Sequence, residues 1–251
     1  MPPALSERGY IFVDAGKAPV SPAASNIWKY AMRIALIHAV QAAMSPVEEA
    51  FKARWPETTR TNILDDSLAA DRESAGGLTP EMSDRIMSLA RYATSSGANA
   101  VLFTCSAFGE AIEAADAALP TPVLKPNEAM FEAALEIGGR IGMLATFAPA
   151  VASMEEEFGD MARRRGSSAS LETYLVPGAR EALRACELEK HDGLIAEAAS
   201  AVANCNAIML AHFTMANAAR RTQNNAKQPV LTAPDSAVLK LRSILTKAAA
   251  T

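Results

Sequence analysis

The chain is poor in the residues on which many metal and disulfide sites are built, because its 251 residues include only three histidines and three cysteines. Cys105, Cys186 and Cys205 form neither a disulfide framework nor a paired metal motif. The scattered histidines argue against a dedicated zinc site. The chain also lacks GxGxxG and Walker A motifs, so nucleotide binding has no local support. We therefore expect a cytoplasmic protein with reduced thiols and no cofactor.

Further absences argue against membrane and nucleic-acid partners. No apolar run approaches the ~20 residues that cross a bilayer, and the N-terminus lacks the basic and apolar regions of a signal peptide. The net charge of −4 argues against a nucleic-acid surface, which needs a basic face. Half of the residues are hydrophobic and 21% are charged, which is typical of a globular protein.

What the chain does contain is a repeat at an offset of 107 residues. The matching pairs are Arg33-Ile34 with Arg140-Ile141, Glu48-Glu49 with Glu155-Glu156, Phe51 with Phe158, Asn99-Ala100 with Asn206-Ala207, and Pro122-Val123-Leu124 with Pro229-Val230-Leu231. The offset holds without a gap over about 90 residues. A duplicated unit usually folds into two similar lobes, and a cleft between them presents equivalent positions from opposite sides.

Strands and helices alternate in each half, which predicts an α/β fold with parallel sheets. The expected strands are 34–37, 61–64, 100–104 and 122–124, then 141–145, 171–176, 207–211 and 230–231. Expected helices start at 45 and 109 and cover 79–97, 128–137, 149–163, 192–203 and 237–249. We therefore predict two pseudo-two-fold-related lobes, each a parallel four-stranded sheet flanked by helices. Their bounds are an N-terminal extension at 1–31, lobe 1 at 32–125 plus 235–251, and lobe 2 at 126–234.

Two helix starts carry local signals. Ser45 precedes Pro46 and lies three residues before Glu48, which predicts an N-cap and a capping box. Thr79-Pro80 predicts another start, and Gly97 predicts the end of that helix.

The candidate chemistry lies at the carboxyl ends of two predicted strands. Ligands of open parallel sheets sit outside these ends. Cys105 ends the third strand of the first half, and His212 is its equivalent at the offset of 107. We therefore expect a thiol and an imidazole to face one another across the cleft. A helix terminus after Cys105 would favour the thiolate and lower the thiol pKa below its usual ~8.5.

Neighbouring residues are candidates for substrate binding. Backbone N–H groups in the turns after Cys105 and His212 can bind an anion, most plausibly a substrate carboxylate. Thr146 follows the first strand of the second half and offers a hydroxyl donor, and His38 ends the equivalent strand of the first half. The full set of candidates is His38, Ser106, Ala107, Thr146, Phe213, Thr214 and Met215.

Other polar pairs have simpler interpretations. A lone cysteine is most often a buried small hydrophobe, so Cys186 and Cys205 are taken as structural. His191-Asp192 fits a helix cap better than a catalytic dyad. Asp65-Asp66 either solvates a loop or lines the cleft, and we favour the loop.

Four segments resemble the aspartate/glutamate/hydantoin racemase superfamily, which also includes maleate cis–trans isomerase and arylmalonate decarboxylase. They are RIALIHAV (33–40), ANAVLFTCSAFG (98–109), RIGMLATFAPAV (140–151) and AIMLAHFTMA (207–216), and the resemblance covers about residues 32–245. It implies two pseudo-symmetric lobes with the active site between them and neither a metal nor an organic cofactor. Cys105 matches the first active-site cysteine, and Ser106-Ala107 its carboxylate-binding neighbours. Thr146 matches a polar position lining the site, and Thr214-Met215 the second carboxylate-binding turn.

The chain departs from this family at His212, where the resemblance implies a second cysteine. An alternative register pairs His212-Phe213 with a His-Phe found just after that cysteine, and it leaves Leu210 at the cysteine position. The offset of 107 favours the first register. In either register there is no second thiol, which argues against a symmetric two-thiol racemization.

Several mechanisms remain open. Cys105 and His212 can act as an acid/base pair in a racemase or epimerase, since an imidazole exchanges protons near neutral pH. One thiol suffices for a decarboxylase or a maleate-type isomerase, and a hydantoin is a further substrate class. A non-catalytic cleft that only binds a small carboxylate is the alternative outside enzymes. No Arg or Lys is obviously placed to select a side-chain carboxylate. Because enzymes of this architecture are often dimers or larger, a homo-oligomer is expected.

Overall fold

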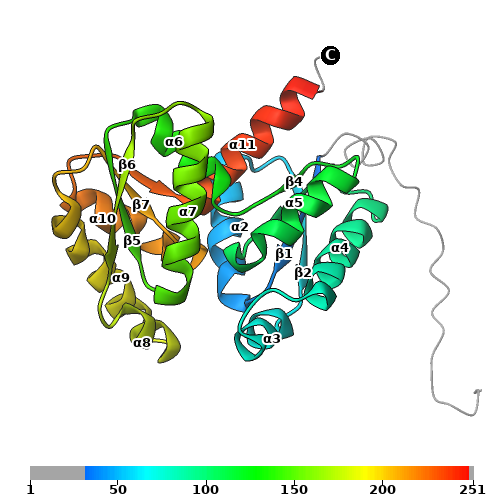
Figure 1. Ribbon diagram of the computed structural model, residues 1–251, viewed down its shortest axis with the longest axis horizontal. Helices are drawn as coiled ribbons and strands as arrows, with labels where there is room; N and C mark the ends of the chain where they lie inside the picture. Colours follow the sequence, from blue (N-terminus) through cyan, green and yellow to red (C-terminus); the bar gives the residue numbers. More distant parts are fainter. Residues whose placement is uncertain (1–31, 249–251) are drawn as a thin grey trace, which may run out of the picture. The chain divides into compact units, whose positions relative to one another are not determined.

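Two parallel four-stranded sheets organise the chain (Figure 1). The computed structural model describes residues 32–248, so the predicted extension at 1–31 lies outside the described residues. Met32–Thr251 form one compact unit. The α/β fold with two four-stranded sheets therefore confirms the predicted fold class.

The first sheet has the strand order β2-β1-β3-β4. Its strands are β1 (Arg33–His38), β2 (Thr59–Leu64), β3 (Ala100–Phe103) and β4 (Val123–Leu124). The helices that follow these strands are α2 (Met44–Arg54), α3 (Ser67–Ala75), α4 (Pro80–Ser95), α5 (Gly109–Ala118) and α6 (Glu128–Ile137), with one-turn 3₁₀ helices η1 (Gln41–Ala43) and η2 (Ser106–Phe108). All pairings are parallel, as βα repeats require.

The second sheet has the equivalent order β6-β5-β7-β8. Its strands are β5 (Arg140–Ala145), β6 (Ser170–Leu175), β7 (Ala207–Leu210) and β8 (Val230–Thr232). Its helices are α7 (Ala148–Arg164), α8 (Ala179–Arg184), α9 (Leu188–Ala198), α10 (Ala219–Asn225) and α11 (Ala233–Ala248), with 3₁₀ helices η3 (Ala199–Val202) and η4 (Phe213–Ala218). Each sheet thus places its two central strands, β1 and β3 or β5 and β7, side by side.

The central strands are buried on both faces, and alternate residues of β1 enter different cores. Ile34 and Leu36 join a large hydrophobic cluster that also contains Ile141 and Met143 of β5. Ala35 and Ile37 join a second cluster under α4 and α5. This period of two follows from the alternation of side chains along a strand. One core therefore connects the first sheet with the second.

Equivalent hydrogen bonds fix the starts of the two central strand pairs. The backbone N–H of Arg33 donates to Asn99 Oδ1 at 2.8 Å, and that of Arg140 donates to Asn206 Oδ1 at 2.9 Å. Ile34 pairs with Ala100 and Ile141 with Ala207, so the offset of 107 holds here.

The ungapped repeat fails at the second strand of each sheet. Arg33 of β1 pairs with Thr59, whereas Arg140 of β5 pairs with Ser170, so β2 and β6 are 111 residues apart (170 − 59) instead of 107. Four extra residues precede β6, and the chain regains the offset of 107 at β7. The prediction of a gap-free repeat is therefore wrong over this segment.

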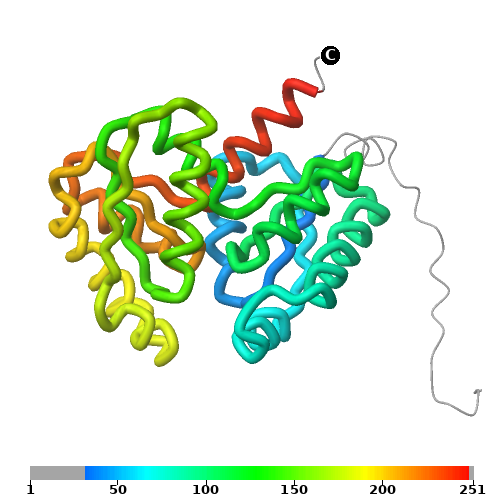
Figure 2. Tube along the Cα trace, viewed as in Figure 1, coloured from blue at the N-terminus to red at the C-terminus, as the bar shows by residue number. Residues whose placement is uncertain are grey.

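Two helices cross between the sheets. Helix α6 follows β4 of the first sheet but packs on α7, β7 and β8 of the second. Helix α11 follows β8 and contacts α2 and α6. In Figure 2 the green trace after β4 and the red C-terminal helix make these crossings. The predicted lobe boundaries at 125/126 and 234/235 stay a prediction.

Most predicted elements are present, and the differences have local causes. Thr79 caps α4 by accepting a hydrogen bond from the Met82 N–H, and Gly97 follows its end with a φ of +84°, as predicted. The prediction that Ser45 is an N-cap is wrong. The 3₁₀ helix η1 runs directly into α2, so Ser45 lies inside the helix and Ala43 occupies the N-cap position. Helices α3 and α8 were not predicted, and α11 begins four residues before its predicted start.

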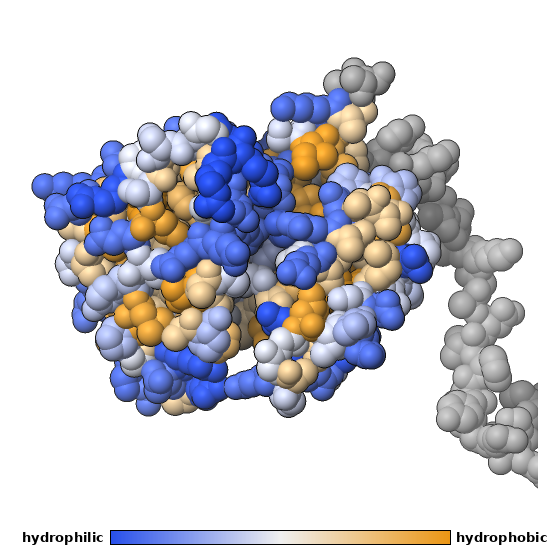
Figure 3. Space-filling view, viewed as in Figure 1, coloured by the Kyte–Doolittle hydropathy of each residue, from blue (hydrophilic) through white to orange (hydrophobic). Residues whose placement is uncertain are grey.

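The surface has no extended apolar band on the face shown in Figure 3, where hydrophobic side chains form separate patches among hydrophilic ones. Among residues 32–248, no helix is both long and apolar enough to span a membrane.

Gly142 generates a test of the packing of the second sheet. An added Cβ at Gly142 in β5 would lie 2.6 Å from Cβ of Val202 in η3. We expect Gly142→Ala to lower the free energy of unfolding by about 1–3 kcal/mol, because packed side chains must shift. Gly77→Ala is the control, since no atom lies within 4 Å of its added Cβ. Urea unfolding followed by circular dichroism measures both, and equal stability of the two variants would contradict this packing.

Candidate active site

A cavity of about 320 Å³ opens at the carboxyl ends of the central strands of both sheets. It is lined by residues that follow each of the strands β1 to β7, including Ala69 and Glu73 of α3 after β2. Six of the predicted site residues lie on its wall: Cys105, Ser106, Thr146, His212, Phe213 and Thr214. The structure therefore brings the thiol and the imidazole to one cavity from different sheets.

The local sequence explains why Cys105 and His212 occupy equivalent places. Each follows a fully buried apolar strand, AVLF in β3 and AIML in β7. Each is extended, with φ and ψ of −121° and 120° for Cys105 and −117° and 148° for His212, and each directly precedes a 3₁₀ helix. Each strand thus ends two residues before the candidate residue, and the chain turns away immediately after that residue.

Three predicted substrate-binding residues do not line this cavity. His38 and Met215 are both 0% exposed, because His38 lies between β2 and β3 and Met215 belongs to the large core. Ala107 lines a second cavity instead. Contact of these three residues with a ligand in the first cavity is therefore not supported.

The Cys105 thiol has a raised pKa, which corrects the prediction of an activated thiolate. Burial raises the pKa of Cys105, and the opposing effects of the Ala107 N–H and the Arg72 guanidinium do not compensate for it. Cys105 is therefore a neutral thiol at neutral pH.

The His212 imidazole is neutral as well. Burial lowers the pKa of His212 to about 4. The Phe147 ring lies 6.4 Å from the His212 ring, centroid to centroid, in an edge-on arrangement. Nε2 of His212 is buried and has no hydrogen-bond partner among the described residues. The imidazole is thus available as a base over most of the pH range.

Two arginines on α8 give the cavity a cationic side, which corrects the expectation that no Arg or Lys is placed there. Arg180 and Arg184 both line the cavity, one helical turn apart. The Arg180 guanidinium lies 4.3 Å from the centroid of the Phe147 ring. Within residues 32–248, neither arginine forms an ion pair. Both guanidinium groups are therefore free to meet an anion.

Thr104 and Asn127 also line the cavity and were not predicted. Asn127 precedes α6, is 2% exposed, and its Nδ2 has no partner in the described part of the chain. Unsatisfied buried polar atoms are rare in folded proteins, and those that face a cavity can be completed by a bound ligand. Asn127 and His212 together therefore indicate a ligand site.

A rule already used for Cys105 and His212 points to these residues. Asn127 follows β4 and Arg180 follows β6, so both come after strand carboxyl ends. The helix that carries Arg180 was missed because only Ala179 and Ala182 of it are buried, which leaves no apolar stripe.

The remaining candidate pairs lie away from this cavity. Neither Asp65-Asp66 nor His191-Asp192 lines it. Asp65 pairs with Arg85 at 2.6 Å, which fits the loop interpretation. His191-Asp192 does not cap a helix, because α9 begins at Leu188; His191 Nδ1 contacts Asp192 Oδ1 at 2.8 Å.

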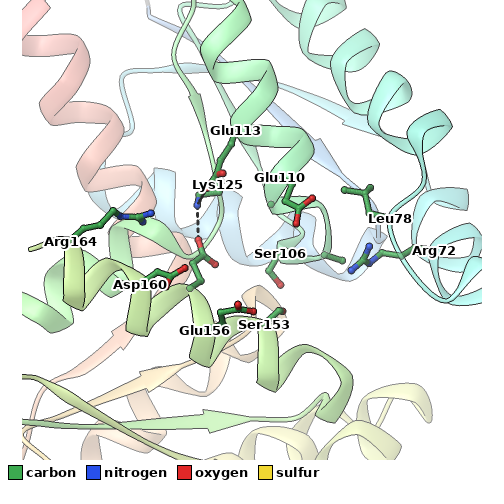
Figure 4. Close-up of a pocket in the computed structure, with 13 residues that line it drawn as sticks. Arg72, Leu78, Ser106, Glu110, Glu113, Lys125, Ser153, Glu156, Asp160 and Arg164 are labelled. Atoms are coloured by element: carbon green, nitrogen blue, oxygen red, sulfur yellow. Dashed lines mark hydrogen bonds and ion pairs between the residues drawn. The ribbon is translucent and has the colours of Figure 1, made fainter.

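A second cavity of about 330 Å³ shares Ser106 with the first (Figure 4). In this view Arg164 lies at one end of it and Arg72 at the other, with Lys125 between them. Lys125 contacts Glu157 of α7 at 2.8 Å and Glu113 of α5 at 2.5 Å. Burial lowers the pKa of Lys125, but the two carboxylates outweigh it and raise that pKa overall. The Lys125 charge is thus already paired, unlike the arginines of the first cavity.

In the described part of the chain, no group of three or more His, Cys, Asp or Glu side chains is placed to hold a metal ion. The first cavity instead offers a thiol, an imidazole, an amide, hydroxyls, two guanidinium groups and the carboxylate of Glu73. These are the groups of a site that binds an anion and moves protons.

The arrangement defines a class of two-sheet α/β proteins with a site at the strand carboxyl ends. Solved structures of this fold are similar at low identity. They include allantoin racemase from Klebsiella pneumoniae (17% identity, TM-score 0.64, 87% of this chain and 89% of that one), glutamate racemase isoform RacE1 from Bacillus anthracis (13%, 0.63, 87% and 83%), and aspartate racemase from Picrophilus torridus (13%, 0.64, 83% and 93%).

The chain belongs to the Asp/Glu/Hydantoin racemase family, whose sequence model matches residues 34–241. No curated protein matches the chain in sequence. Family membership supports a racemase or isomerase function.

The lowered pKa of His212 predicts a loss of stability in acid. An unfolded imidazole binds a proton as the pH falls below about 6.5, whereas folded His212 does so only near pH 4. The stability is therefore complete above pH 6.5 and falls between pH 6.5 and 4, by about 2 kcal/mol at pH 5. His38 has a pKa shifted in the same direction and adds to this loss.

Urea unfolding at pH 7 and pH 5 measures this difference. We expect His212→Gln to lose less stability than the wild type between these two pH values, since it has no proton to bind. An equal loss in both proteins would show that His212 is not a buried neutral imidazole.

Proposed function

We propose that the protein is a cofactor-independent racemase or isomerase that exchanges the proton alpha to a carboxylate in a small substrate. The proposal depends most on one observation, the presence of Cys105 and His212 on the wall of the same cavity. They follow equivalent central strands of different sheets, so a bound substrate has one group on each side.

The resting protonation states define the first step. Because His212 is a neutral imidazole and Cys105 a neutral thiol, His212 is the base and Cys105 the acid. The imidazole takes the proton from one face of the α-carbon, and the Cys105 S–H delivers a proton to the opposite face. This leaves an imidazolium and a thiolate, and a proton passes from His212 back to Cys105 through solvent after release. The reverse direction starts from the ion-pair form.

Developing negative charge needs donors near the substrate carboxylate. We assign this role to Asn127 and to backbone N–H groups at Ser106 and Thr214, which lie on the cavity wall. Donors aimed at a developing oxyanion lower the barrier by roughly 3–4 kcal/mol each. Thr146, which follows β5, adds a hydroxyl to the cavity wall.

The arginines indicate a second anionic group on the substrate. Arg180 is half-buried and held against Phe147, which itself lies beside His212. A fixed guanidinium binds a carboxylate with two parallel hydrogen bonds. We therefore propose a substrate with one carboxylate at the α-carbon and a further anionic or carbonyl group about one side chain away.

A one-thiol reaction is the second candidate, and the raised pKa of Cys105 favours it. A protonated thiol can donate to the enolate left by decarboxylation of a substituted malonate. In that reaction His212 takes no proton from the substrate, so its removal is tolerated.

Cys105→Ser and His212→Asn separate these reactions. We expect each to lower α-proton exchange by about 10²–10⁴-fold, since each removes a proton-transfer group. Proton NMR in deuterated buffer measures loss of the α-proton signal with aspartate, glutamate, hydantoins, maleate and substituted malonates.

Product formation by His212→Asn at the wild-type rate, with Cys105→Ser inactive, would replace the two-sided reaction with the one-thiol reaction. No exchange and no product from the wild type across this panel would instead favour a cleft that only binds.

Arg180 provides a test of the second anionic group. We expect Arg180→Gln to raise KM for a dicarboxylate substrate by about 10–100-fold with a smaller effect on kcat, because the lost hydrogen bonds are charge-assisted. Arg91→Gln is the matched control, since Arg91 is exposed on α4 and outside the cavity. A KM that Arg180→Gln leaves unchanged would refute this assignment. Steady-state kinetics on the three proteins decides.

A further inference from the structure

A chain of hydrogen bonds connects the wall of the first cavity with the surface of the first sheet. Thr104 Oγ1 lies 2.9 Å from Nδ1 of the buried His38. Nε2 of His38 lies 2.9 Å from Asn62 Oδ1, and Asn62 Nδ2 donates to Glu48 Oε1 at 3.0 Å. Arg60 Nε donates to the other oxygen of Glu48 at 3.1 Å. The proposed reaction uses none of these hydrogen bonds.

Glu48, at the outer end of this series of hydrogen bonds, fixes the orientation of the Asn62 amide. A carboxylate accepts hydrogen bonds and cannot donate them, so the Glu48 oxygen must face the NH₂ group of Asn62. Asn62 Oδ1 then faces His38, and it can only accept. His38 therefore carries a proton on Nε2 and donates it to Asn62.

The tautomer of His38 determines what Thr104 can offer. Burial lowers the pKa of His38, although Asn62 and Glu48 oppose this, so the imidazole is neutral. With its proton on Nε2, Nδ1 of His38 is an acceptor and the Thr104 hydroxyl donates to it. The other acceptor near this hydroxyl, the Ile37 carbonyl, is farther away at 3.4 Å. The Thr104 hydroxyl then has no hydrogen left to donate, so it can offer a ligand only its lone pairs.

The second sheet shows that the fold does not require these hydrogen bonds. The equivalents of His38 and Thr104 at the offset of 107 are Ala145 and Ala211, which form no such bonds. The equivalent of Asn62 by strand register is Thr173, because Leu36 pairs with Asn62 and Met143 with Thr173. The Thr173 hydroxyl is buried and has no partner in the described residues. Both Thr104 and Ala211 line the cavity. The hydrogen bonds of His38 therefore give the cavity a hydroxyl at Thr104 where the equivalent position of the second sheet has only a methyl group.

We infer that His38 is a positioning residue, held by Asn62 and Glu48, which makes the Thr104 hydroxyl an acceptor for an N–H group carried on the reacting carbon of the substrate. The inference rests on the proposed function and specifies its substrate class. Amino acids and hydantoins carry such an N–H, whereas maleate and substituted malonates do not. The Thr104 hydroxyl thus binds the N–H group of the substrate, while Asn127 and the two arginines bind its oxygen atoms.

Binding to matched ligand pairs tests this directly, without requiring turnover. The pairs are L- and D-aspartate against succinate, and 5-methylhydantoin against 2-methylsuccinimide, in which a CH₂ group replaces the N–H. Isothermal titration calorimetry of the full chain gives both affinities. We expect the wild type to bind the N–H member about tenfold more tightly in at least one pair.

Variants then locate the source of this preference. Thr104→Val should reduce the ratio to about one without weakening the carbon analogue, and Thr104→Ser should restore it. Asn62→Leu lies outside the cavity and frees the His38 tautomer, so it should lower the ratio partway. Thr173→Val is the matched control on β6 and should leave the ratio unchanged. Circular dichroism confirms that each variant is folded.

Equal or weaker binding of the N–H members by the wild type would overturn the inference. So would a ratio that Thr104→Val leaves intact. A tenfold preference without any α-proton exchange would sustain the inference about Thr104 and refute the proposed catalysis. Exchange of aspartate or hydantoin without a preference would sustain the catalysis and refute the role of Thr104.

Discussion

One hydrophobic core that both sheets share holds the candidate site together. Ile34 and Leu36 on one face of β1 pack in the same cluster as Ile141 and Met143 of β5. Helices α6 and α11 cross between the sheets and reinforce this connection. Residues that follow the strands of different sheets can therefore line one cavity at fixed positions. Catalytic groups need this rigidity, since proton transfer requires them within hydrogen-bond reach of the substrate.

Burial that positions these groups also determines their charge. The same desolvation raises the pKa of Cys105 and lowers that of His212, so the pair rests without charge. A neutral pair is less costly to bury than an ion pair. The charged side chains that line the cavity are Arg180, which is half-buried, and Arg184 and Glu73, which are exposed. The cavity thus combines an uncharged thiol and imidazole with two guanidinium groups and one carboxylate, and this excess of positive charge suits an anionic ligand.

The sequence predicts the fold well where burial dictates the residue type. Strands such as Ala100–Phe103 are uniformly apolar because both faces of the sheet are covered. Thr79 caps α4 because its side chain accepts a hydrogen bond from a free N–H of the first turn. The short helices α3 and α8 bury one leucine and two alanines respectively, so no periodic pattern identifies them. Ser45 follows the rules for a cap, but the preceding η1 turn already begins the helix.

The site was predictable to the extent that it follows strand ends. Cys105 and His212 come from the spacing of the repeat. Asn127 and Arg180 also follow strand ends, but the fold was needed to show that they line the same cavity. The thiol pKa was predicted in the wrong direction, because a sequence shows the helix after Cys105 but not the burial around it. The role of His38 also depended on its partners, since its position after β1 suggested a ligand contact that its full burial does not support.

The proposed reaction requires Cys105 and His212 to act from opposite faces of the substrate. Its most direct test is the early distribution of deuterium between the two enantiomers when one pure enantiomer reacts in deuterated buffer. Two groups on opposite faces predict that the newly formed enantiomer carries deuterium while the remaining substrate keeps its proton. Equal early labelling of both enantiomers would mean that a single group removes and returns the proton, and it would contradict this account.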